Sequence, residues 1–513
     1  MPCGSTFSVE RLGPSEVGLP KKYKPPTGAP GVLPRLAGVR LAALVAEIPG
    51  ARVVGDTAVE VGSLAYDSRK VGPGTLFFCV PGEKTDGHDF AAAAVEAGAV
   101  GLAVERELDL DVAQVVVADA RAAMAPLAAR FWGDPTGELR VVGVTGTNGK
   151  TTTAFLIREV LEAAGIQTGL LGTVRQVVGG AEEDVERTTP EAIDLQATFR
   201  RMLGAGDRAC VMEVSSHALA LHRADAIHFE LALFTNLTQD HLDFHRDMEE
   251  YFQSKRLLFG MGPSVSVVNV DDGYGRRLAE EFDCVTFSAE GAEADFVATD
   301  VSFDVGGAEF SVAGTEVRTD LPGHFNIANA LGAFATATKL GVSAQVAAEG
   351  LARAKRVPGR FEPIDEGQDF AVLVDYAHTP DSLENVLRAA QRLSEGRVLS
   401  VFGAGGDRDR DKRPKMGLAG ASLSDVAIVT SDNPRSEEPE AIIGEILSGI
   451  ENGANVEVEP DRRAAIALAL RRARSGDTVV IAGKGHEQGQ EFEDGRKVPF
   501  DDREVAREEL RRL

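Results

Sequence analysis

The sequence predicts an α/β fold in three domains: a small α/β N-terminal domain, a central P-loop domain with a parallel-rich sheet, and a Rossmann-like C-terminal α/β domain. The first observation is length, since 513 residues exceed what one hydrophobic core normally serves. The second is that short apolar runs alternate with amphipathic helical patterns, which is typical of parallel sheets covered on both faces. The third is a glycine-rich loop that joins one apolar run to a helical pattern.

The N-terminal part of the chain divides into a tail and a small domain. Residues 1–34 are rich in proline and glycine and show no periodicity, so we expect a flexible tail. From residue 35 to residue 138, strand-like runs at 74–80 and 113–119 lie between alanine-rich helical patterns. These patterns predict a small α/β domain.

The central domain is expected over residues 139–355. The break "WGDPTGE" leads to an apolar strand at 139–144, a glycine loop and a helix at 150–165. Further strands are predicted from the apolar, β-branched runs at 208–214, 229–237 and 264–270.

The C-terminal domain is expected over residues 356–513, where the alternation starts afresh. The predicted strands are 370–376, 396–403, 425–431 and 477–483, and the helices between them are 380–393, 440–450 and 461–474. Three polar loops, "GAGGDRDRDKR", "SDNPR" and "GKGHEQ", follow strands of this set. Because ligands of such sheets lie beyond the carboxyl ends of the strands, the three loops predict one site.

The composition excludes several classes of partner. With 54 basic and 79 acidic residues the net charge is -25, which argues against nucleic acid or an anionic membrane surface. The four widely spaced cysteines indicate neither a zinc site nor a disulfide framework, and we expect a reducing cytoplasm. No secretion signal or membrane-spanning run is recognised. We therefore expect small-molecule substrates, no nucleic acid, no membrane insertion and a monomer.

The loop "VTGTNGKTTT" predicts nucleotide binding. Gly146 and Gly149 let backbone N–H groups surround phosphate oxygens, Lys150 can reach the β/γ oxygens, and the Thr151 hydroxyl can bind Mg²⁺. The strict P-loop pattern fails at one position, where Val144 replaces the first glycine. The loop alone leaves a kinase, a ligase, an NTPase switch and an inert binder open.

Two further strands end in residues that suit a metal ion. Glu213 ends the strand in "MEVSSH", and hard oxygen ligands are those that Mg²⁺ prefers. The strand before "TNLTQDHLDFH" leads to acidic and histidine side chains at Asp240, His241, Asp243 and His245.

Seven segments together carry a resemblance to a known family. They are "GTNGKTT", "MEVSSHALALHR", "TNLTQDHLDFH", "YFQSKRLLF", "LPGHFNIANALGA", "VPGRFE" and "VDYAHTPDSL". In this order they resemble the Mur ligases of peptidoglycan synthesis, whose central domain is an ATPase. "YDSR", "GEKTDG" and "DNPR" are similar to the members that add meso-2,6-diaminopimelate to UDP-N-acetylmuramoyl-L-alanyl-D-glutamate.

The resemblance implies ATP-driven amide formation. The γ-phosphoryl group moves to a carboxylate, and the amine of the incoming amino acid then displaces phosphate from the acyl phosphate. The implied catalytic residues are Lys150, Glu213, His241 and Lys255, and the implied metal ligands are Thr151, Glu213, His241 and Lys255. Lys255 is implied to be carbamylated: a neutral lysine amine adds CO₂ and becomes an anionic ligand.

The resemblance also assigns the two nucleotide substrates. The implied ATP contacts are Gly146, Thr147, Asn148, Gly149, Lys150, Thr151, Thr152, Asn326, Arg360, Asp375 and His378. The implied contacts of the UDP-linked substrate are Ser68, Glu83, Lys84, Thr85, Thr188, Thr189, Ser215 and Arg223. The chain departs from relatives that often carry glutamine where Leu221 stands.

The third substrate explains the loop "DNPR". Diaminopimelate differs from lysine by a second carboxylate, which a guanidinium holds bidentately. Arg435 is expected to bind that carboxylate, with Asp432 and Asn433 around the adjacent ammonium group. The full expected set is Arg408, Asp432, Asn433, Pro434, Arg435, Gly483 and Glu487.

Four alternatives stay open from the sequence. A ligase of the same family could add L-lysine or another amino acid, although "DNPR" argues against lysine. Folylpolyglutamate synthesis would not need the first domain. A P-loop kinase and a non-catalytic nucleotide-binding scaffold are the alternatives from other classes.

Overall fold

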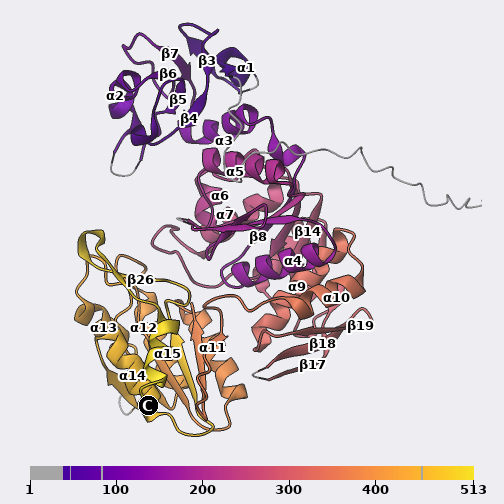
Figure 1. The fold of residues 1–513 in the computed structure, drawn as a ribbon, viewed down its shortest axis with the longest axis vertical. Helices are drawn as coiled ribbons and strands as arrows, with labels where there is room; N and C mark the ends of the chain where they lie inside the picture. The colour runs from indigo at the N-terminus through magenta and orange to yellow at the C-terminus, as the bar shows by residue number, and fades with distance from the viewer. Residues whose placement is uncertain (1–37, 47, 83–84, 186, 305, 452–453) are drawn as a thin grey trace, which may run out of the picture.

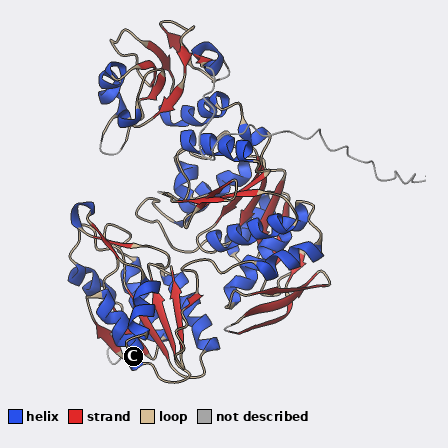
Figure 2. Ribbon diagram, in the orientation of Figure 1, coloured by secondary structure: helices blue, strands red, loops and turns tan. Residues whose placement is uncertain are grey.

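The computed structural model describes residues 38–513 apart from 47, 83–84, 186, 305 and 452–453. Three α/β units follow one another along the chain, each with its own main sheet flanked by helices (Figure 1; Figure 2). The predicted fold class is therefore confirmed. The predicted tail, residues 1–34, lies outside the described residues.

The N-terminal unit is a five-stranded sheet of order β2-β7-β6-β5-β4, parallel except for β2. Helices α1 and α3 pack on one face and α2 on the other, which explains why every residue of β5 is buried. The strands are β1 Val39–Arg40, β2 Arg52–Val54, β3 Glu60–Val61, β4 Ser63–Ala65, β5 Thr75–Phe78, β6 Ala99–Val104 and β7 Ala113–Val116. The helices are α1 Leu41–Val45, α2 Ala91–Glu96 and α3 Ala120–Phe131, with short 3₁₀ turns η1 Ser68–Lys70, η2 Gly87–Phe90 and η3 Pro135–Gly137.

The central unit is a nine-stranded sheet of order β11-β10-β9-β12-β8-β13-β14-β15-β16. Its strands pair in parallel except for β10, which is antiparallel to both β9 and β11. One face packs against α4, α9 and α10, and the other against α5, α6, α7 and α8. Because both faces are covered, the central strands are apolar throughout.

The elements of this sheet and its helices have the following bounds. The strands are β8 Arg140–Thr145, β9 Thr168–Leu171, β10 Gln176–Val178, β11 Ala181–Glu183, β12 Ala209–Glu213, β13 Phe229–Phe234, β14 Val265–Asn269, β15 Cys284–Ser288 and β16 Phe296–Val297. The helices are α4 Lys150–Ala163, α5 Ala192–Ala205, α6 Ser216–Ala220, α7 Met248–Gly260, α8 Gly273–Glu281, α9 His324–Lys339 and α10 Ala344–Arg353.

A three-stranded antiparallel sheet, absent from the sequence-based prediction, belongs to the same unit. It comprises β17 Thr299–Asp304, β18 Gly307–Val312 and β19 Thr315–Thr319. Apolar residues of β18 and β19 join the same core as α9 and α10, beside which the sheet lies (Figure 1).

The C-terminal unit is a six-stranded sheet of order β20-β21-β25-β22-β23-β24, parallel except for β20. Helices α11 and α13 pack on one face and α14 and α15 on the other. The strands are β20 Glu362–Pro363, β21 Ala371–Asp375, β22 Val398–Phe402, β23 Val426–Val429, β24 Val456–Val458, β25 Thr478–Ala482 and the hairpin β26 Gly489–Glu491 with β27 Lys497–Pro499. The helices are α11 Pro380–Leu393, α12 Lys412–Leu423, α13 Pro439–Leu447, α14 Arg462–Arg472 and α15 Asp502–Leu510, with the turn η4 Glu493–Gly495.

The start of helix α11 is set by its capping residues. Thr379 caps it in a capping box with Ser382, and Pro380 occupies the first turn, where a missing N–H costs nothing. The predicted helix 380–393 matches α11 at both ends.

We propose domain boundaries between residues 138 and 139 and between residues 355 and 356. β8 begins at Arg140, α10 ends at Arg353, and β20 begins at Glu362.

Among the described residues, no helix combines the length and apolar character needed to cross a bilayer.

Candidate functional site

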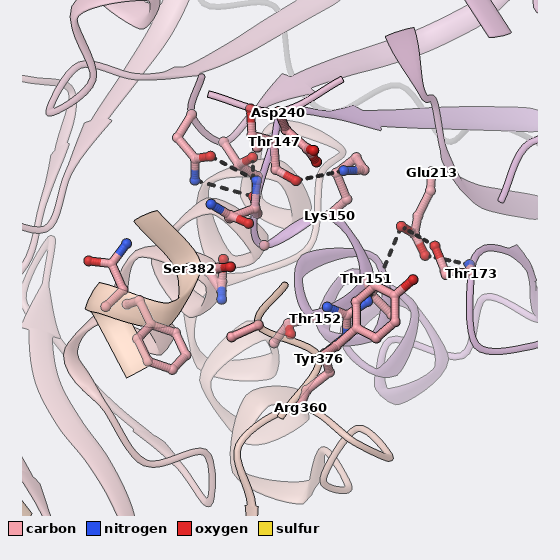
Figure 3. A pocket seen from close by; sticks show the side chains of 18 of the residues that line it. Thr147, Lys150, Thr151, Thr152, Thr173, Glu213, Asp240, Arg360, Tyr376 and Ser382 are labelled. Atoms are coloured by element: carbon pink, nitrogen blue, oxygen red, sulfur yellow. Dashed lines mark hydrogen bonds between the residues drawn. The ribbon is translucent and has the colours of Figure 1, made fainter. Parts of the chain in front are cut away.

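A cavity of about 740 Å³ lies at the carboxyl ends of the central strands. The P-loop, the loops after β12 and β13, and residues 360–386 of the next unit all line it. The close view shows Thr151, Glu213 and Thr173 on one side and Arg360, Tyr376 and Ser382 approaching from the C-terminal unit (Figure 3). The cavity is therefore built from two domains.

The P-loop has the geometry of a phosphate cradle. Gly146 and Gly149 have φ values of 145° and 84°, and a side chain on Gly146 would collide with the hydroxyl of Thr235. Helix α4 begins directly after Gly149, so its N-terminal N–H groups and dipole face the loop. Val144, which breaks the strict pattern, is a buried residue of β8 and leaves this geometry intact.

Lys150 lies within the loop that it would serve. Its ammonium group donates to the carbonyls of Gly146 at 3.0 Å and Thr147 at 2.8 Å. Burial lowers its pKa, while the carboxylates of Glu213 and Asp240 oppose that shift. A bound phosphate would supply the same negative charge more closely.

Glu213 is held by three hydrogen bonds that aim it at the P-loop. It accepts from Thr151 Oγ1 at 3.0 Å, from Thr173 N at 2.7 Å and from Thr173 Oγ1 at 3.0 Å. Arg360 of the C-terminal unit donates to the same Thr151 hydroxyl at 3.0 Å. Thr173 was missed from the sequence, although its position just after β9 was a usable signal.

Thr151 and Glu213 are the candidate ligands of a magnesium ion. In the part of the chain that is described, no set of three or more His, Cys, Asp or Glu side chains is arranged to hold a metal. Mg²⁺, however, is usually bound through one or two carboxylates with phosphate oxygens and waters. The Thr151 hydroxyl and the Glu213 carboxylate fit that requirement.

Lys255 is the most unusual lysine of the site. It lies on α7, is buried, donates to the Gly146 carbonyl at 2.7 Å and stands 4.6 Å above the ring of Tyr251. Burial and the neighbouring Lys150 hold its pKa well below the usual value. Its side chain is thus poised to be a neutral amine.

His241, whose side chain is 35% exposed, belongs to a cluster of aromatic and imidazole rings. Its ring centre lies 4.8 Å from that of His217 and 5.9 Å from that of Tyr251, and its Nε2 is 3.3 Å from Asp240 Oδ2. Burial lowers the pKa of His241 to about 3 and that of His217 to about 4, so both rings are neutral. His217 and Asp243 line the cavity, whereas His245 bonds Ser216.

The other predicted ATP contacts fall into two groups. Thr147, Asn148, Thr152, Asp375 and His378 line the cavity. Asn326 is buried, donates to the Pro322 carbonyl at 2.8 Å and accepts from Asn329, which lines the cavity in its place. The carboxylate of Asp375 accepts two backbone N–H groups, and burial raises its pKa to about 6. The contacts of all these residues with ATP stay predictions.

The predicted contacts of the UDP-linked substrate lie partly in this cavity. Thr188, Thr189, Ser215 and Arg223 line it, and Arg223 pairs with Glu191 at 2.9 Å. Ser68 begins η1 in the N-terminal unit, and Thr85 is exposed. Glu83 and Lys84 lie outside the described residues.

The predicted amino-acid contacts gather at the carboxyl edge of the C-terminal sheet. Asn433 Nδ2 donates to Glu487 at 2.8 Å, and the buried Lys484 donates to both Asn433 and Glu487. Arg408 lines the large cavity. The set is completed by Asp432, Pro434, Arg435 and Gly483.

Arg435 combines a strained backbone with a partly paired side chain. Its φ is 52°, a left-handed value that a non-glycine residue seldom adopts. Its guanidinium donates to Glu491 at 3.1 Å and to the Gly406 carbonyl at 2.6 Å. The side chain is thereby held between the loop after β22 and strand β26.

Polar contacts join the C-terminal unit directly to the P-loop. Asp381, at the start of α11, accepts from Asn148 Nδ2 at 2.8 Å and from Thr238 Oγ1 at 3.1 Å. The sequence offered no signal for this contact, because the partners are more than 140 residues apart.

Three family models match the chain: "Mur ligase family, catalytic domain" over residues 60–132, "Mur ligase middle domain" over 144–337 and "Mur ligase, glutamate ligase domain" over 359–485. A protein of Streptomyces coelicolor named UDP-N-acetylmuramoyl-L-alanyl-D-glutamate–2,6-diaminopimelate ligase is 46% identical over 477 residues, which cover 89% of this chain and 94% of that relative. The protein of the same name from Solibacter usitatus is 47% identical over 466 residues, covering 88% and 94%.

Two solved structures are similar to this chain over most of its length. A structure bearing that enzyme name matches with a TM-score of 0.66 at 31% identity and covers 93% of this chain and 99% of its own. MurF ligase from Thermotoga maritima, in complex with ADP, matches with a TM-score of 0.59 at 20% identity, covering 88% and 96%, and shares the fold.

Proposed function

The chain belongs to the Mur ligase family, and on that premise we propose that it joins meso-2,6-diaminopimelate to UDP-N-acetylmuramoyl-L-alanyl-D-glutamate. The reaction is ATP-dependent and ADP-forming, and it belongs to peptidoglycan precursor synthesis. The observation that carries the proposal is the two-domain cavity, where a P-loop meets Arg360 and Arg408 of the amino-acid-binding unit.

Phosphoryl transfer needs positioning and charge neutralisation more than covalent chemistry from the protein. The P-loop N–H groups and Lys150 would bind the β- and γ-phosphates, and Arg360 reaches the same place through Thr151. Thr151 and Glu213 would hold Mg²⁺, which would add positive charge at the phosphate oxygens. The D-glutamyl carboxylate attacks the γ-phosphorus, and ADP leaves.

The second half-reaction forms the amide. The amine of the amino acid attacks the carbonyl carbon of the acyl phosphate, and inorganic phosphate leaves as the C–N bond forms. Arg223, Thr188, Thr189 and Ser215 would hold the peptide end of the acceptor, and Ser68, Glu83, Lys84 and Thr85 its uridine nucleotide. Arg223 suits a carboxylate because its guanidinium is charged and planar.

The coupling of the two halves provides the test of this proposal. Phosphate release with ATP and the UDP-muramoyl dipeptide is expected to require an added amino acid, measured as inorganic phosphate over time. Release that is equally fast without an amino acid would instead indicate a kinase or an NTPase.

Lys255 is proposed to carry a CO₂-derived carbamate and, with His241, to complete the metal-binding set. Its burial and lowered pKa favour the neutral amine that CO₂ requires. With ¹³C-bicarbonate, the wild-type protein is expected to show one carbamate carbon resonance that Lys255→Ala lacks. An identical spectrum from both proteins would remove the modification from the account.

Arg435 is proposed to bind the distal carboxylate of diaminopimelate. Arg435→Ala is expected to cost about 2–3 kcal/mol, which is the loss for a charged hydrogen bond in a desolvated site. The readout is kcat/KM for diaminopimelate, and the slower reaction with lysine should hardly change.

Arg410→Ala is the matched control, because this neighbouring arginine is exposed and pairs with Glu445. It should leave kcat/KM for both amino acids within about twofold, as surface pairs contribute little. An equal loss for both amino acids in Arg435→Ala would contradict the assigned role.

The cellular setting follows from the substrates. ATP and a nucleotide-linked precursor point to the cytoplasm, with small molecules rather than nucleic acid or a membrane as partners. We propose a monomer, since the cavity is completed by two domains of one chain.

A further inference from the structure

Arg462 and Asp502 form a buried ion pair next to the loops of the proposed amino-acid subsite. Arg462 begins α14 and Asp502 begins α15, and neither side chain is exposed (0% for both). The guanidinium donates from Nε to Oδ1 at 2.8 Å and from Nη2 to Oδ2 at 2.7 Å, a bidentate pair. Neither residue lines the large cavity.

Arg462 also binds the two loops that carry the predicted amino-acid contacts. Its Nη2 donates to the Ala482 carbonyl at 2.9 Å and its Nη1 to the Ser431 carbonyl at 3.3 Å. Ser431 follows β23, and Ala482 ends β25. Because β22 separates these strands in the sheet, no ladder hydrogen bond sets the distance between the two loops. The guanidinium of Arg462 spans that gap, as do the Lys484–Asn433 and Asn433–Glu487 hydrogen bonds.

The carboxylate next to Ser431 is buried. Asp432 is only 7% exposed, and among the described residues its Oδ2 has no hydrogen-bond partner. A Cβ at position 483 would collide with this oxygen, so the lack of a side chain at Gly483 makes room for it. A buried carboxylate oxygen without a partner is costly unless a ligand satisfies it.

The charges around Asp432 favour the ionised carboxylate. Burial alone would raise its pKa, but the cations of Lys484 and Arg462 outweigh burial and bring the pKa below the usual value. Asp502 in turn neutralises Arg462, which keeps the guanidinium from competing for the ligand's own carboxylates.

The location of Arg462 is not explained by helix stability. A cation in the first turn of a helix opposes the helix dipole. A buried ion pair is also commonly no more stabilising than apolar side chains of similar volume. The pair is therefore expected to add little to the stability of the protein and to act mainly on the position and charge of the two loops.

We propose that Arg462 and Asp502 are positioning residues of the amino-acid subsite, which fix the loops at 431–435 and 482–487 relative to each other and aim Asp432 at the ammonium group of the incoming amino acid. This inference rests on the proposed function, because it assumes that an amino acid binds there. Neither residue touches the reacting atoms.

The test compares Asp502→Asn with Asp477→Asn. Asp477 pairs with Arg397 at 2.6 Å in the same sheet, but next to the amino end of β25, away from the loops. In Asp502→Asn the KM for diaminopimelate is expected to rise about tenfold, as for weakened charged hydrogen bonds. The KM values for ATP and the UDP-linked substrate should stay within about twofold. Asp477→Asn should lower the unfolding temperature without moving any KM.

Two further variants separate positioning from stability. The double variant Arg462→Met/Asp502→Leu removes both charges and keeps an apolar core, so it should fold and still show the raised KM. Arg462→Lys keeps the charge without the fork and should give an intermediate KM. A wild-type KM for diaminopimelate in the folded double variant would overturn the inference.

The wild-type protein in the same assay distinguishes a failure of the proposed function from a failure of the inference about Arg462 and Asp502. If it forms no diaminopimelate product at all, the proposed function is wrong. If it does, and the variants share its KM, the inference about Arg462 and Asp502 alone is wrong.

Discussion

Lys150→Ala is expected to lower kcat for phosphoryl transfer by roughly 10³-fold, the scale observed when one preorganised electrostatic group is removed from a reaction centre. Lys150 contacts two P-loop carbonyls, at 3.0 and 2.8 Å. Without it the negative charge that shifts between the β- and γ-phosphates loses its fixed counter-charge. The measurement is ADP formation in a single turnover with saturating ATP.

The control for this substitution is stability. Lys150 donates to two loop carbonyls, so its removal is expected to cost on the order of 1–2 kcal/mol of folding free energy. Thermal unfolding checks that the variant is folded at the assay temperature. A folded Lys150→Ala protein that retains more than a tenth of the wild-type rate would contradict the assigned role.

Lys255→Ala is expected to lower the rate of amide formation by a similar factor, roughly 10³. The alanine cannot carry the proposed carbamate, so the site would lose that anionic group close to Lys150 and would gain a void. Added bicarbonate should give no rescue, because a methyl group has no amine to react with CO₂. The measurement is the rate of the complete reaction with and without bicarbonate.

Arg256→Ala is the matched control on the same helix. Arg256 is the next residue, points to the surface and pairs with Glu281. Its removal should change the rate by less than about twofold, as for other exposed pairs. A near-normal rate in Lys255→Ala would show that neither the carbamate nor the lysine is needed.

The sequence predicted several core strands directly, among them β8, β12, β13, β14, β21, β22, β23 and β25, but not β9, β15 or β24. Strands such as β12 and β25 are buried on both faces, so they are continuous apolar runs bounded by polar loops. The P-loop and Glu213 were found for the same reason, because each follows such a strand. Their contact through Thr151 required only that neighbouring parallel strands end at one edge.

The antiparallel sheet β17–β19 was missed because its strands are half-exposed and weakly apolar. β17 in particular is largely exposed, and its pattern carries little hydrophobic signal. Its identity as a strand depends on pairing with β18, which brings alternating apolar residues to the core of α9 and α10.

Contacts between distant residues were equally inaccessible from the sequence. Lys255 lies in a helix whose charged residues resemble a solvated face, and only packing against Tyr251 and the P-loop buries it. The pair of Arg462 with Asp502 joins two helix starts 40 residues apart. Side chains of this kind are recognised only when the fold has placed them.

The most direct measurement offers the wild-type protein diaminopimelate and lysine together, with ATP, Mg²⁺ and the UDP-muramoyl dipeptide, and identifies the product by mass. The expected product carries diaminopimelate, and one ADP and one phosphate form for each amide bond. A product that carries mainly lysine, or ADP formed without any amide, would contradict the central claim that this ligase selects its amino acid through the Arg435 loop.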